Sequence, residues 1–361
     1  MNWIVLTIAL IFNAAGLFLL WRVPTFKNQP LKTKLNVSII IPARNEAKRM
    51  IPLLTSIQEQ KSIIHEWIVV DDHSTDETAT IAKSFGAKVI TAEALPRGWF
   101  GKPWACYQGA KAAQGEVYMF LDADTVFMPK GLEKILASFE DDQTPLSVQP
   151  YHLMKKSYEE LSLFFNLIVM MTTGLFTPRG SSIKASSFFG PCQVIAKKDY
   201  WQVDGHAVAK HAILEDIALG NALQEKTGQR IRAMAGRGAI AFQMYPEGIT
   251  SLIEGWTNNF ATGAGLIPGW MLATVSLWIT GMFIAFLSGI APFMWEGQAY
   301  LIGYVLIGVD TYLLARKVGR SSILTIVTYP IQLIFCVWLF ARSSSRSKKK
   351  KVTWKGRDLD L

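Results

Sequence analysis

Cysteine is scarce in this chain of 361 residues, which contains only Cys106, Cys192 and Cys336. Three widely spaced cysteines predict neither a disulfide framework nor a zinc cluster, which argues against a small scaffold held together by either. Reduced thiols are instead typical of a domain in the cytoplasm. No recognition motif for nucleic acid accompanies the basic residues behind the net charge of +9, so we expect no nucleic-acid partner.

Charge is also scarce, at 18% of the residues, and it is almost missing from four stretches of about membrane-spanning length. These stretches are residues 3–21, 266–295, 297–315 and 321–341. Asp310 is the only charged residue within them. A core helix of a soluble protein rarely runs so long without a charge. We therefore predict four membrane segments, which Pro268, Pro292 and Pro330 could break or kink.

Basic residues flank the apolar stretches and predict their orientation. No positive charge precedes the first stretch and no small-residue cleavage site follows it, which argues against a signal peptide. Arg22, Lys27 and further lysines follow it instead, so the positive-inside rule places the next domain in the cytoplasm. The same rule places the tail after residue 341, with its four consecutive lysines, on that side. We expect a multi-pass protein of the cell membrane.

Four full crossings conflict with this orientation, because a chain that begins outside and crosses four times also ends outside. Residues 321–341 lie between two basic clusters, so we expect this stretch to be re-entrant or interfacial and bent at Pro330. Two alternatives stay open. One is a merged pair of segments elsewhere, and the other is an additional dip into the membrane by residues 163–176.

Three apolar runs end in polar residues, as strands of an open α/β sheet do where a ligand binds. They are residues 38–41, followed by Pro42, Ala43, Arg44, Asn45 and Glu46; residues 67–70, followed by Asp71, Asp72, His73 and Ser74; and residues 116–121, followed by Asp122, Ala123 and Asp124. The carboxyl ends of parallel strands meet at one edge of the sheet, so these polar groups are predicted to line a single rim. Ser74 and Glu77 have the spacing of a capping box at a helix start.

Asp122 and Asp124 are the most informative pair in the sequence. In an extended segment, residues i and i+2 point to the same side, so both carboxylates would face one crevice. Two negative charges this close repel unless a cation lies between them. Mg²⁺ and Mn²⁺ prefer oxygen ligands and commonly bridge to the phosphates of a substrate. We therefore predict a site for one of these cations at Asp122 and Asp124.

In these motifs the chain resembles the family 2 glycosyltransferases of the GT-A fold, over about residues 36–265. The resemblance implies an α/β, Rossmann-like domain that binds a nucleotide sugar. It assigns the metal to Asp124 and Asp122, and nucleotide-sugar binding to Pro42, Ala43, Arg44, Glu46, Asp71, Asp72, Lys102 and Asp122. Asp71 or Asp72 could accept the N–H of a uracil. Lys102 could neutralise a diphosphate, although a surface lysine in a loop is the alternative.

The resemblance and the apolar stretches together divide the chain. We expect an N-terminal transmembrane helix at residues 1–22, a cytoplasmic GT-A domain at 36–265, membrane segments at 266–341 and a basic cytoplasmic tail at 342–361. A catalytic domain bracketed by membrane segments suits an acceptor that cannot leave the bilayer.

A second acidic pair, Glu215 and Asp216, follows Ile213 and Leu214 much later in the chain. In the family, an acidic pair here supplies the catalytic base, and Asp216 matches that position. The base removes the proton of an acceptor oxygen that lies opposite the departing nucleotide, in an inverting transfer. The metal offsets the charge that grows on the leaving phosphate. A helix N-terminus enriched in acids is the structural alternative.

Four further stretches resemble the glycosyltransferases of bacterial carotenoid pathways. They are residues 147–152, 189–191, 254–257 and 354–357. This resemblance implies transfer of glucose from UDP-glucose to the carboxylate of a C30 carotenoid acid, with other enzymes of pigment synthesis as candidate partners. The acceptor residues that we expect are His152, Phe189 and Trp256, although Trp256 could equally be an interfacial anchor.

Two further segments bear on the identity of the acceptor. Many processive and lipid-acceptor relatives carry a Gln-x-x-Arg-Trp motif where this chain has residues 256–260, and its absence argues against a polysaccharide synthase. Residues 163–171 are strongly apolar, and they form either a core helix or a surface that dips into lipid beside the acceptor.

The chemistry of the acceptor separates the possible functions. A carboxylic acid with a pKa of about 4–5 is ionised at neutral pH and needs no general base, whereas a hydroxyl does. The rival enzyme is a transferase to a hydroxylated lipid such as a diacylglycerol, ceramide or hopanoid. The rival outside enzymes is an inactive membrane scaffold, against which the intact Asp122, Asp124 and Asp216 argue.

Overall fold

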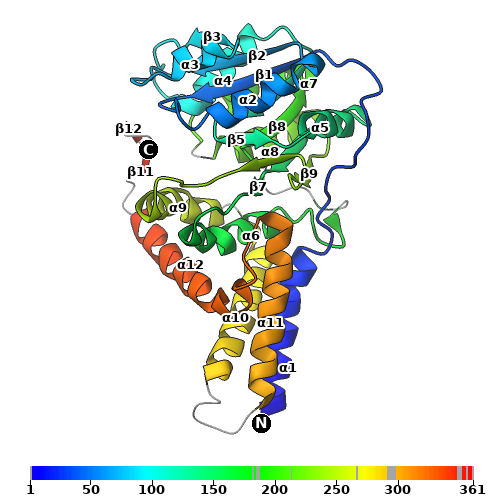
Figure 1. Cartoon of the computed structure of the whole chain (residues 1–361), viewed down its shortest axis with the longest axis vertical. Helices are drawn as coiled ribbons and strands as arrows, with labels where there is room; N and C mark the ends of the chain where they lie inside the picture. Colours follow the sequence, from blue (N-terminus) through cyan, green and yellow to red (C-terminus); the bar gives the residue numbers. More distant parts are fainter. Residues whose placement is uncertain are drawn as a thin grey trace.

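A computed structural model describes residues 2–180, 183, 188–212, 214–265, 267–290, 298–347, 352–354 and 357–359 (Figure 1). Ile213 of the acidic motif, residues 291–297 of the predicted membrane segments, the four lysines at 348–351, and Lys355 and Gly356 lie outside these ranges. Along the long axis of the molecule, an α/β part lies at one end and a group of long helices projects from the other (Figure 1).

The α/β part is built on a seven-stranded mixed sheet, in the order β3-β2-β1-β4-β8-β6-β9. In that order the strands are Lys88–Thr91, Glu66–Asp71, Val37–Ala43, Val117–Leu121, Cys192–Ala196, Leu146–Gln149 and Arg232–Ala235. Strand β1 pairs in parallel with both β2 and β4, whereas β8 is antiparallel to β4 and β6. The carboxyl ends of β1, β2 and β4 therefore meet at one edge, as predicted from the three apolar runs.

Helices cover both faces of this sheet. Along β1, Ile39 and Ile41 point into one core and Ile40 into the other, because successive strand residues face opposite sides. The helices of this part are α2 Ile51–Glu59, α3 Thr78–Ser84, α4 Gly101–Ala112, α5 Gly131–Glu140, α7 Lys197–Gln202 and α8 Glu215–Thr227, with 3₁₀ turns η1 Lys61–Ile63 and η4 Gly205–Ala209. A three-stranded sheet adds β5 Thr125–Phe127, β10 Ile240–Phe242 and β7 Tyr151–His152.

A layer of helices lies between the sheets and the projecting bundle (Figure 1). It consists of η2 Ser157–Ser162, α6 Leu163–Met171 and α9 Ile249–Ala264. Every residue of α6 except Val169 is buried. Of the two alternatives for this segment, the structure therefore has the core helix.

Three helices from distant parts of the chain run side by side away from the sheet: α1 Asn2–Leu19, α10 Gly269–Ile290 and α11 Gln298–Val318 (Figure 1). Gly16 permits the close approach of α1 and α10, because a Cβ there would lie 2.5 Å from Nε1 of Trp278. The Asn13 amide donates to Asp310 Oδ2 at 2.7 Å, which connects α1 to α11. The one charge in the predicted membrane stretches thus has a polar partner on a neighbouring helix.

Helix α12, Thr325–Ser347, runs obliquely from this bundle to α9 (Figure 1). Tyr329, Leu333 and Leu339 are buried against the helical layer, and the Ser343 hydroxyl donates to the carbonyl of Thr257 at 2.7 Å. Pro330 lies within the helix and does not end it. A short hairpin, β11 Val352–Trp354 and β12 Arg357–Leu359, follows.

Two helices in the described part of the chain are long and apolar enough to cross a membrane: Gly269–Ser288 in α10 and Thr325–Ser345 in α12. Trp3–Leu19 in α1 is a shorter apolar helix. Most of the large apolar side chains that are exposed lie on α1, α10, α11 and α12 and on the loop before α12. That concentration distinguishes the projecting part from the α/β part.

Candidate active site

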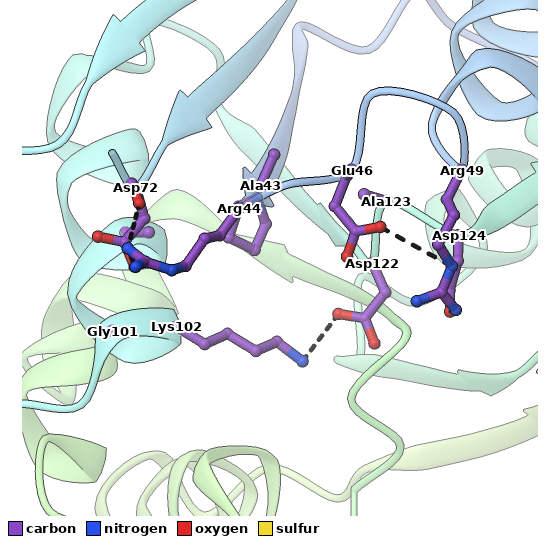
Figure 2. Close-up of a pocket in the computed structure, with 12 residues that line it drawn as sticks. Ala43, Arg44, Glu46, Arg49, Asp72, Gly101, Lys102, Asp122, Ala123 and Asp124 are labelled. Carbon is purple, nitrogen blue, oxygen red and sulfur yellow. Dashed lines mark hydrogen bonds and ion pairs between the residues drawn. The ribbon is translucent and has the colours of Figure 1, made fainter. Parts of the chain in front are cut away.

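A polar cavity of about 180 Å³ lies at the rim where β1, β2 and β4 end (Figure 2). The residues that line it come from the three strand ends and the first turn of α4. They are Pro42, Ala43, Arg44, Glu46, Arg49, Asp72, Gly101, Lys102, Ala105, Asp122, Ala123 and Asp124. The rim predicted from sequence thus encloses a real cavity, and Asp71 is the one predicted nucleotide-sugar residue that does not line it.

The loop after β1 and the loop after β2 hold each other in place. Arg44 Nη1 donates to the Asp72 carbonyl at 2.7 Å and lies 3.6 Å from its carboxylate (Figure 2). Asp71 turns away and accepts the N–H of Ser74 at 3.3 Å. Of the two acids considered for a nucleobase, Asp72 is the one positioned at the cavity.

The predicted capping box at Ser74 and Glu77 is wrong. Helix α3 begins at Thr78 without a side-chain cap from its N-cap residue Glu77. The Ser74 hydroxyl instead accepts the N–H of Asn45 at 3.0 Å, from the neighbouring loop. A contact between the two loops replaced the local cap, because the β1 and β2 ends lie side by side in the sheet.

Asp122 and Asp124 both face the cavity, but not for the predicted reason. The segment is a turn and not extended, since the N–H of Thr125 donates to the Asp122 carbonyl at 3.2 Å. The turn places the two carboxylates in the same cavity with different partners. Asp122 meets Lys102, and Asp124 meets Arg49 (Figure 2).

Lys102 lies between two carboxylates, with Nζ 2.7 Å from Asp122 Oδ1 and 2.8 Å from Glu215 Oε1. Helix α4 begins at Gly101, so Lys102 projects from its first turn and is not a surface lysine in a loop. Burial opposes its charge, but Asp122 and Glu215 outweigh burial and hold the pKa of Lys102 well above its ordinary value. Lys102 is a permanent cation that joins the strand ends to the acidic motif of α8.

Arg49 is the cavity residue that sequence reasoning missed. Its Nη2 lies 2.8 Å from Asp124 Oδ2, and its Nε lies 3.5 Å from Glu247 and 3.8 Å from Glu46. Arg49 is three residues after Glu46 in the same loop, and that spacing was the available signal. The side chain connects the predicted metal ligand to the segment that leads into α9.

Asp122 and Asp124 are the carboxylates at the β4 end of the cavity that could hold a divalent cation. Asp122 and Asp124 each contact a cationic side chain, so this part of the cavity already stabilises positive charge next to carboxylate oxygen. Among the residues that the structure describes, no group of three or more His, Cys, Asp or Glu is gathered as a metal site. The donor set fits Mg²⁺ or Mn²⁺ with further oxygens from a bound diphosphate.

Asp216 lies at the junction of this polar region with a second cavity. Burial and the neighbouring Glu215 raise the pKa of Asp216 to about 7, against the opposing effect of Lys102. Gly190 leaves the space at this junction open, since a Cβ there would lie 3.1 Å from Asp216 Oδ2 and 3.5 Å from Lys102 Nζ. The predicted acidic motif and the Phe-Gly-Pro motif therefore meet in space.

The second cavity is larger, about 520 Å³, and almost entirely apolar. Its walls come from α6, α9, α10 and α12 and from the segments before β8 and around β10. They include Gln149, Asn166, Phe188, Phe189, Asp216, Phe242, Trp256, Phe260, Leu272, Ser276, Thr280, Val337 and Phe340. Asp216 is the one carboxylate among the residues that line it in the described chain, and the thiol of Cys336 is its other ionisable group.

The three predicted acceptor residues have different positions. Phe189 and Trp256 line the apolar cavity. The Trp256 indole N–H donates to the Ser162 hydroxyl at 3.0 Å, and its ring stacks on Phe165 at 4.7 Å. His152 does not line the cavity; it lies behind Asn166, with its Nδ1 3.0 Å from the Asn166 amide. His152 therefore supports the wall.

Comparison with known proteins identifies the family. Residues 38–202 match the model of Glycosyl transferase family 2. The chain is 35% identical over 345 residues to 4,4'-diaponeurosporenoate glycosyltransferase of Staphylococcus haemolyticus, which covers 93% of this chain and 91% of the relative. The chain belongs to glycosyl transferase family 2. This glycosyltransferase is also 35% identical over 333 residues to a protein of the same name from Staphylococcus aureus, which covers 90% and 88% of the two chains.

A solved structure shares the fold. It is a mannosyltransferase from Pyrobaculum calidifontis in complex with GDP-Man and Mn²⁺, with a TM-score of 0.57 and 16% sequence identity. The match covers 95% of this glycosyltransferase and 99% of the mannosyltransferase. The α/β part therefore has the GT-A fold that the sequence motifs predicted.

Proposed function

We propose that this glycosyltransferase moves glucose from UDP-glucose to the carboxylate of the C30 carotenoid acid 4,4'-diaponeurosporenoate, with inversion, to form a glycosyl ester. The main supporting observation is that a charged cavity and an apolar cavity are neighbours, because Lys102 of the first lies beside Gly190 and Asp216 of the second. A transferase with a charged donor and a lipophilic acceptor needs this juxtaposition. Both Staphylococcus relatives are named 4,4'-diaponeurosporenoate glycosyltransferase, which supports the choice of acceptor.

The polar cavity is assigned to the donor. Pro42, Ala43, Arg44 and Asp72 lie at the end suited to the nucleoside, where the Asp72 carboxylate can accept a base N–H. Lys102 would neutralise one charge of the diphosphate. Glu46 lines the same cavity, and its N–H donates to Thr78 Oγ1 at 2.8 Å, so it fixes the loop that faces the nucleotide.

The divalent cation is assigned to Asp124 and Asp122, and Mn²⁺ in the mannosyltransferase with the same fold supports this choice. When bound, Mg²⁺ or Mn²⁺ supplies a Lewis acid that stabilises negative charge on the leaving phosphate. Arg49 and Lys102 flank the same two carboxylates, so they keep the site close to neutral. The ion pair between Lys102 and Glu215 also holds the Glu215 carboxylate next to the polar cavity.

The apolar cavity is assigned to the acceptor. Its one carboxylate in the described chain, Asp216, faces the junction where a carboxyl end group would meet the donor. With a pKa of about 7, Asp216 is largely protonated in mildly acidic solution and can donate a hydrogen bond to an acceptor carboxylate. Two carboxylates in one apolar site would otherwise repel each other.

A hydroxylated membrane lipid is the second candidate acceptor, and the same observation favours it. A carboxylate with a pKa of about 7 suits a general base at neutral pH, which a hydroxyl acceptor requires. The two acceptors therefore give Asp216 opposite protonation states. The cavity accommodates the apolar body of either acceptor.

For the membrane we propose three crossings, by α1, α10 and α11, with α12 in the interface. Helix α12 buries one face on the helical layer, whereas Val327, Ile331, Ile334 and Trp338 on its other face are exposed. A helix that packs one face on the protein and turns an apolar face outward can lie along the membrane interface beside the domain. Three crossings place the GT-A domain and the tail on the same, cytoplasmic side, which satisfies both basic flanks. Other enzymes of pigment synthesis are proposed as partners on that membrane.

The experiment is a pigment extraction from a bacterial host that makes 4,4'-diaponeurosporenoate, with and without this protein, analysed by mass spectrometry. The expected product is a more polar pigment, heavier by one hexose and released by mild alkali, as a glycosyl ester is. An unchanged pigment together with metal-dependent release of UDP would exclude this acceptor and favour a hydroxylated lipid. Incubation with other UDP-sugars in membranes identifies the sugar.

A further inference from the structure

The apolar cavity reaches the surface of the protein at the end away from Asp216. Its inner end holds Phe189, which is buried, and Gly190. At the outer end, the wall residues of α10 and α12 are exposed. They are Leu272 at 42%, Val337 at 40% and Phe340 at 38%, together with Ser276 and Thr280. The cavity therefore has its mouth between α10 and α12.

The surface around this mouth is apolar. Trp270, Leu277 and Leu287 on α10, and Ile334 and Trp338 on α12, are exposed without lining the cavity. Soluble proteins rarely expose a contiguous apolar area of this kind. The mouth thus faces the proposed hydrocarbon region and not water. A water-soluble ligand would have to cross that region to reach it.

Helix arrangement explains why the mouth stays open. Helix α10 runs down the bundle beside α1, while α12 leaves the bundle obliquely toward α9 (Figure 1). The two helices diverge, and the cavity lies between them under α6 and α9. The side chains on the α10 rim, Ser276 and Thr280, are small, and both hydroxyls donate to carbonyls of their own helix. They therefore leave the entrance unobstructed and add little polarity.

We propose that the acceptor enters this cavity sideways from the bilayer, between α10 and α12, with its carboxyl end leading toward Asp216. This inference rests on the proposed function and commits to one occupant, a linear apolar chain that ends in a carboxyl group. A cavity of about 520 Å³ encloses a ligand of ordinary drug size. The end of a C30 chain fits inside, and the rest of the chain remains in the leaflet during transfer.

The test is photolabelling of the full-length protein in lipid nanodiscs that contain a long-chain fatty acid with a diazirine near its carboxyl end. The wild type is expected to label at Phe189 and Leu214, the wall residues next to Gly190 and Asp216 at the junction. Ser276→Trp fills the mouth and is expected to reduce this labelling about tenfold. Leu277→Trp is the matched control, because it introduces the same indole one residue away, outside the cavity, and is expected to label like the wild type.

Folding is checked separately, by Mn²⁺-dependent UDP binding, which all variants should retain since the donor cavity is distant from the mouth. Val337→Trp blocks the mouth from the opposite helix and should reproduce the effect of Ser276→Trp. Unchanged labelling of the wall in both blocked variants would overturn lateral entry.

Transfer assays separate this inference from the proposed function. In the same nanodiscs, Ser276→Trp should reduce kcat/KM for the carotenoid acid about tenfold with UDP binding intact. If the wild type transfers nothing to that acid while the labelling depends on the mouth as expected, the acceptor assignment fails and lateral entry stands. If the wild type transfers glucose to the acid but Ser276→Trp and Val337→Trp change neither the labelling nor kcat/KM, lateral entry fails and the function stands.

Discussion

The two neighbouring cavities of this glycosyltransferase differ in size, in the charge of their walls and in the elements that form them. The donor cavity is small and lined by charged residues, and each of Arg49 and Lys102 is paired with carboxylates. The acceptor cavity is nearly three times as large and almost uncharged. The donor cavity comes from strand ends close together in one sheet, whereas the acceptor cavity is enclosed by helices far apart in sequence. Changes in the first should affect chemistry, and changes in the second should affect acceptor binding.

Asp124→Ala should have the largest effect, because it removes a carboxylate that would hold the proposed divalent cation, which would offset the charge on the departing nucleotide. We expect kcat to fall by about 10²–10³-fold for any acceptor. The measurement is UDP release from UDP-glucose in membranes with saturating Mn²⁺. Glu59→Ala, an exposed carboxylate at the end of α2, is the control. Full activity of Asp124→Ala would end the metal assignment.

Gly190→Ala tests the junction between the two cavities. The new Cβ would lie 3.1 Å from Asp216 Oδ2, in the space where donor and acceptor meet, so we expect kcat to fall about tenfold. Gly263→Ala is the matched control in the apolar cavity, because among the described residues its Cβ would meet Leu214 alone, at 3.7 Å. Equal kinetics for the two variants would show that the cavities do not meet at Gly190.

Phe260→Ala tests the acceptor wall. Removing the ring takes apolar contact from the acceptor, so KM for the carotenoid acid should rise about fivefold, with kcat and UDP binding little changed. Leu277→Ala removes an apolar side chain that does not line the cavity and should leave KM unaltered. A rise in the KM for UDP-glucose instead would assign this wall to the donor.

Asp216→Asn should have the smallest effect if the acceptor is a carboxylate, within about threefold near pH 6, because the amide keeps a hydrogen-bond donor. The wild type loses its proton as pH rises through about 7, so its activity should fall there, and Asp216→Asn should not show that fall. With a hydroxyl acceptor the signs reverse: activity rises through about pH 7, and Asp216→Asn loses about 10²–10⁴-fold. The pH–rate profile of both proteins decides between the acceptors.

The sequence correctly predicted which short motifs lie together at the strand ends. The residues after β1 and β4 line the donor cavity as predicted, since a parallel sheet brings its strand ends to one edge. It failed in local geometry. The Asp122–Asp124 segment is a turn, and Ser74 contacts Asn45 and does not cap α3. The turn is closed by a local hydrogen bond from Thr125, whereas the Ser74 contact comes from the neighbouring loop across the sheet, which spacing along the chain does not encode.

The acceptor side shows the limit of the same method. Phe189 and Trp256 line the cavity, but His152 lies one layer behind it, and Arg49 and Asn166 were not anticipated. An alternation of apolar residues indicates which face of a helix is buried, not whether it meets a neighbour or an empty volume. The C-terminal segments are a similar case. Pro330 does not break α12, and its direction depends on its packing with α9.

By itself the sequence determined the α/β fold, the family and the charged residues of the polar cavity other than Arg49, because hydrophobic periodicity and adjacent polar groups are local properties of the chain. Only the tertiary structure decided which of these charges pair, since Lys102, Asp122 and Glu215 come from three separate elements. It also decided that a volume stays open between α6, α9, α10 and α12. A cavity is the space that packing leaves unfilled, so it depends on the relative positions of helices and not on any one segment.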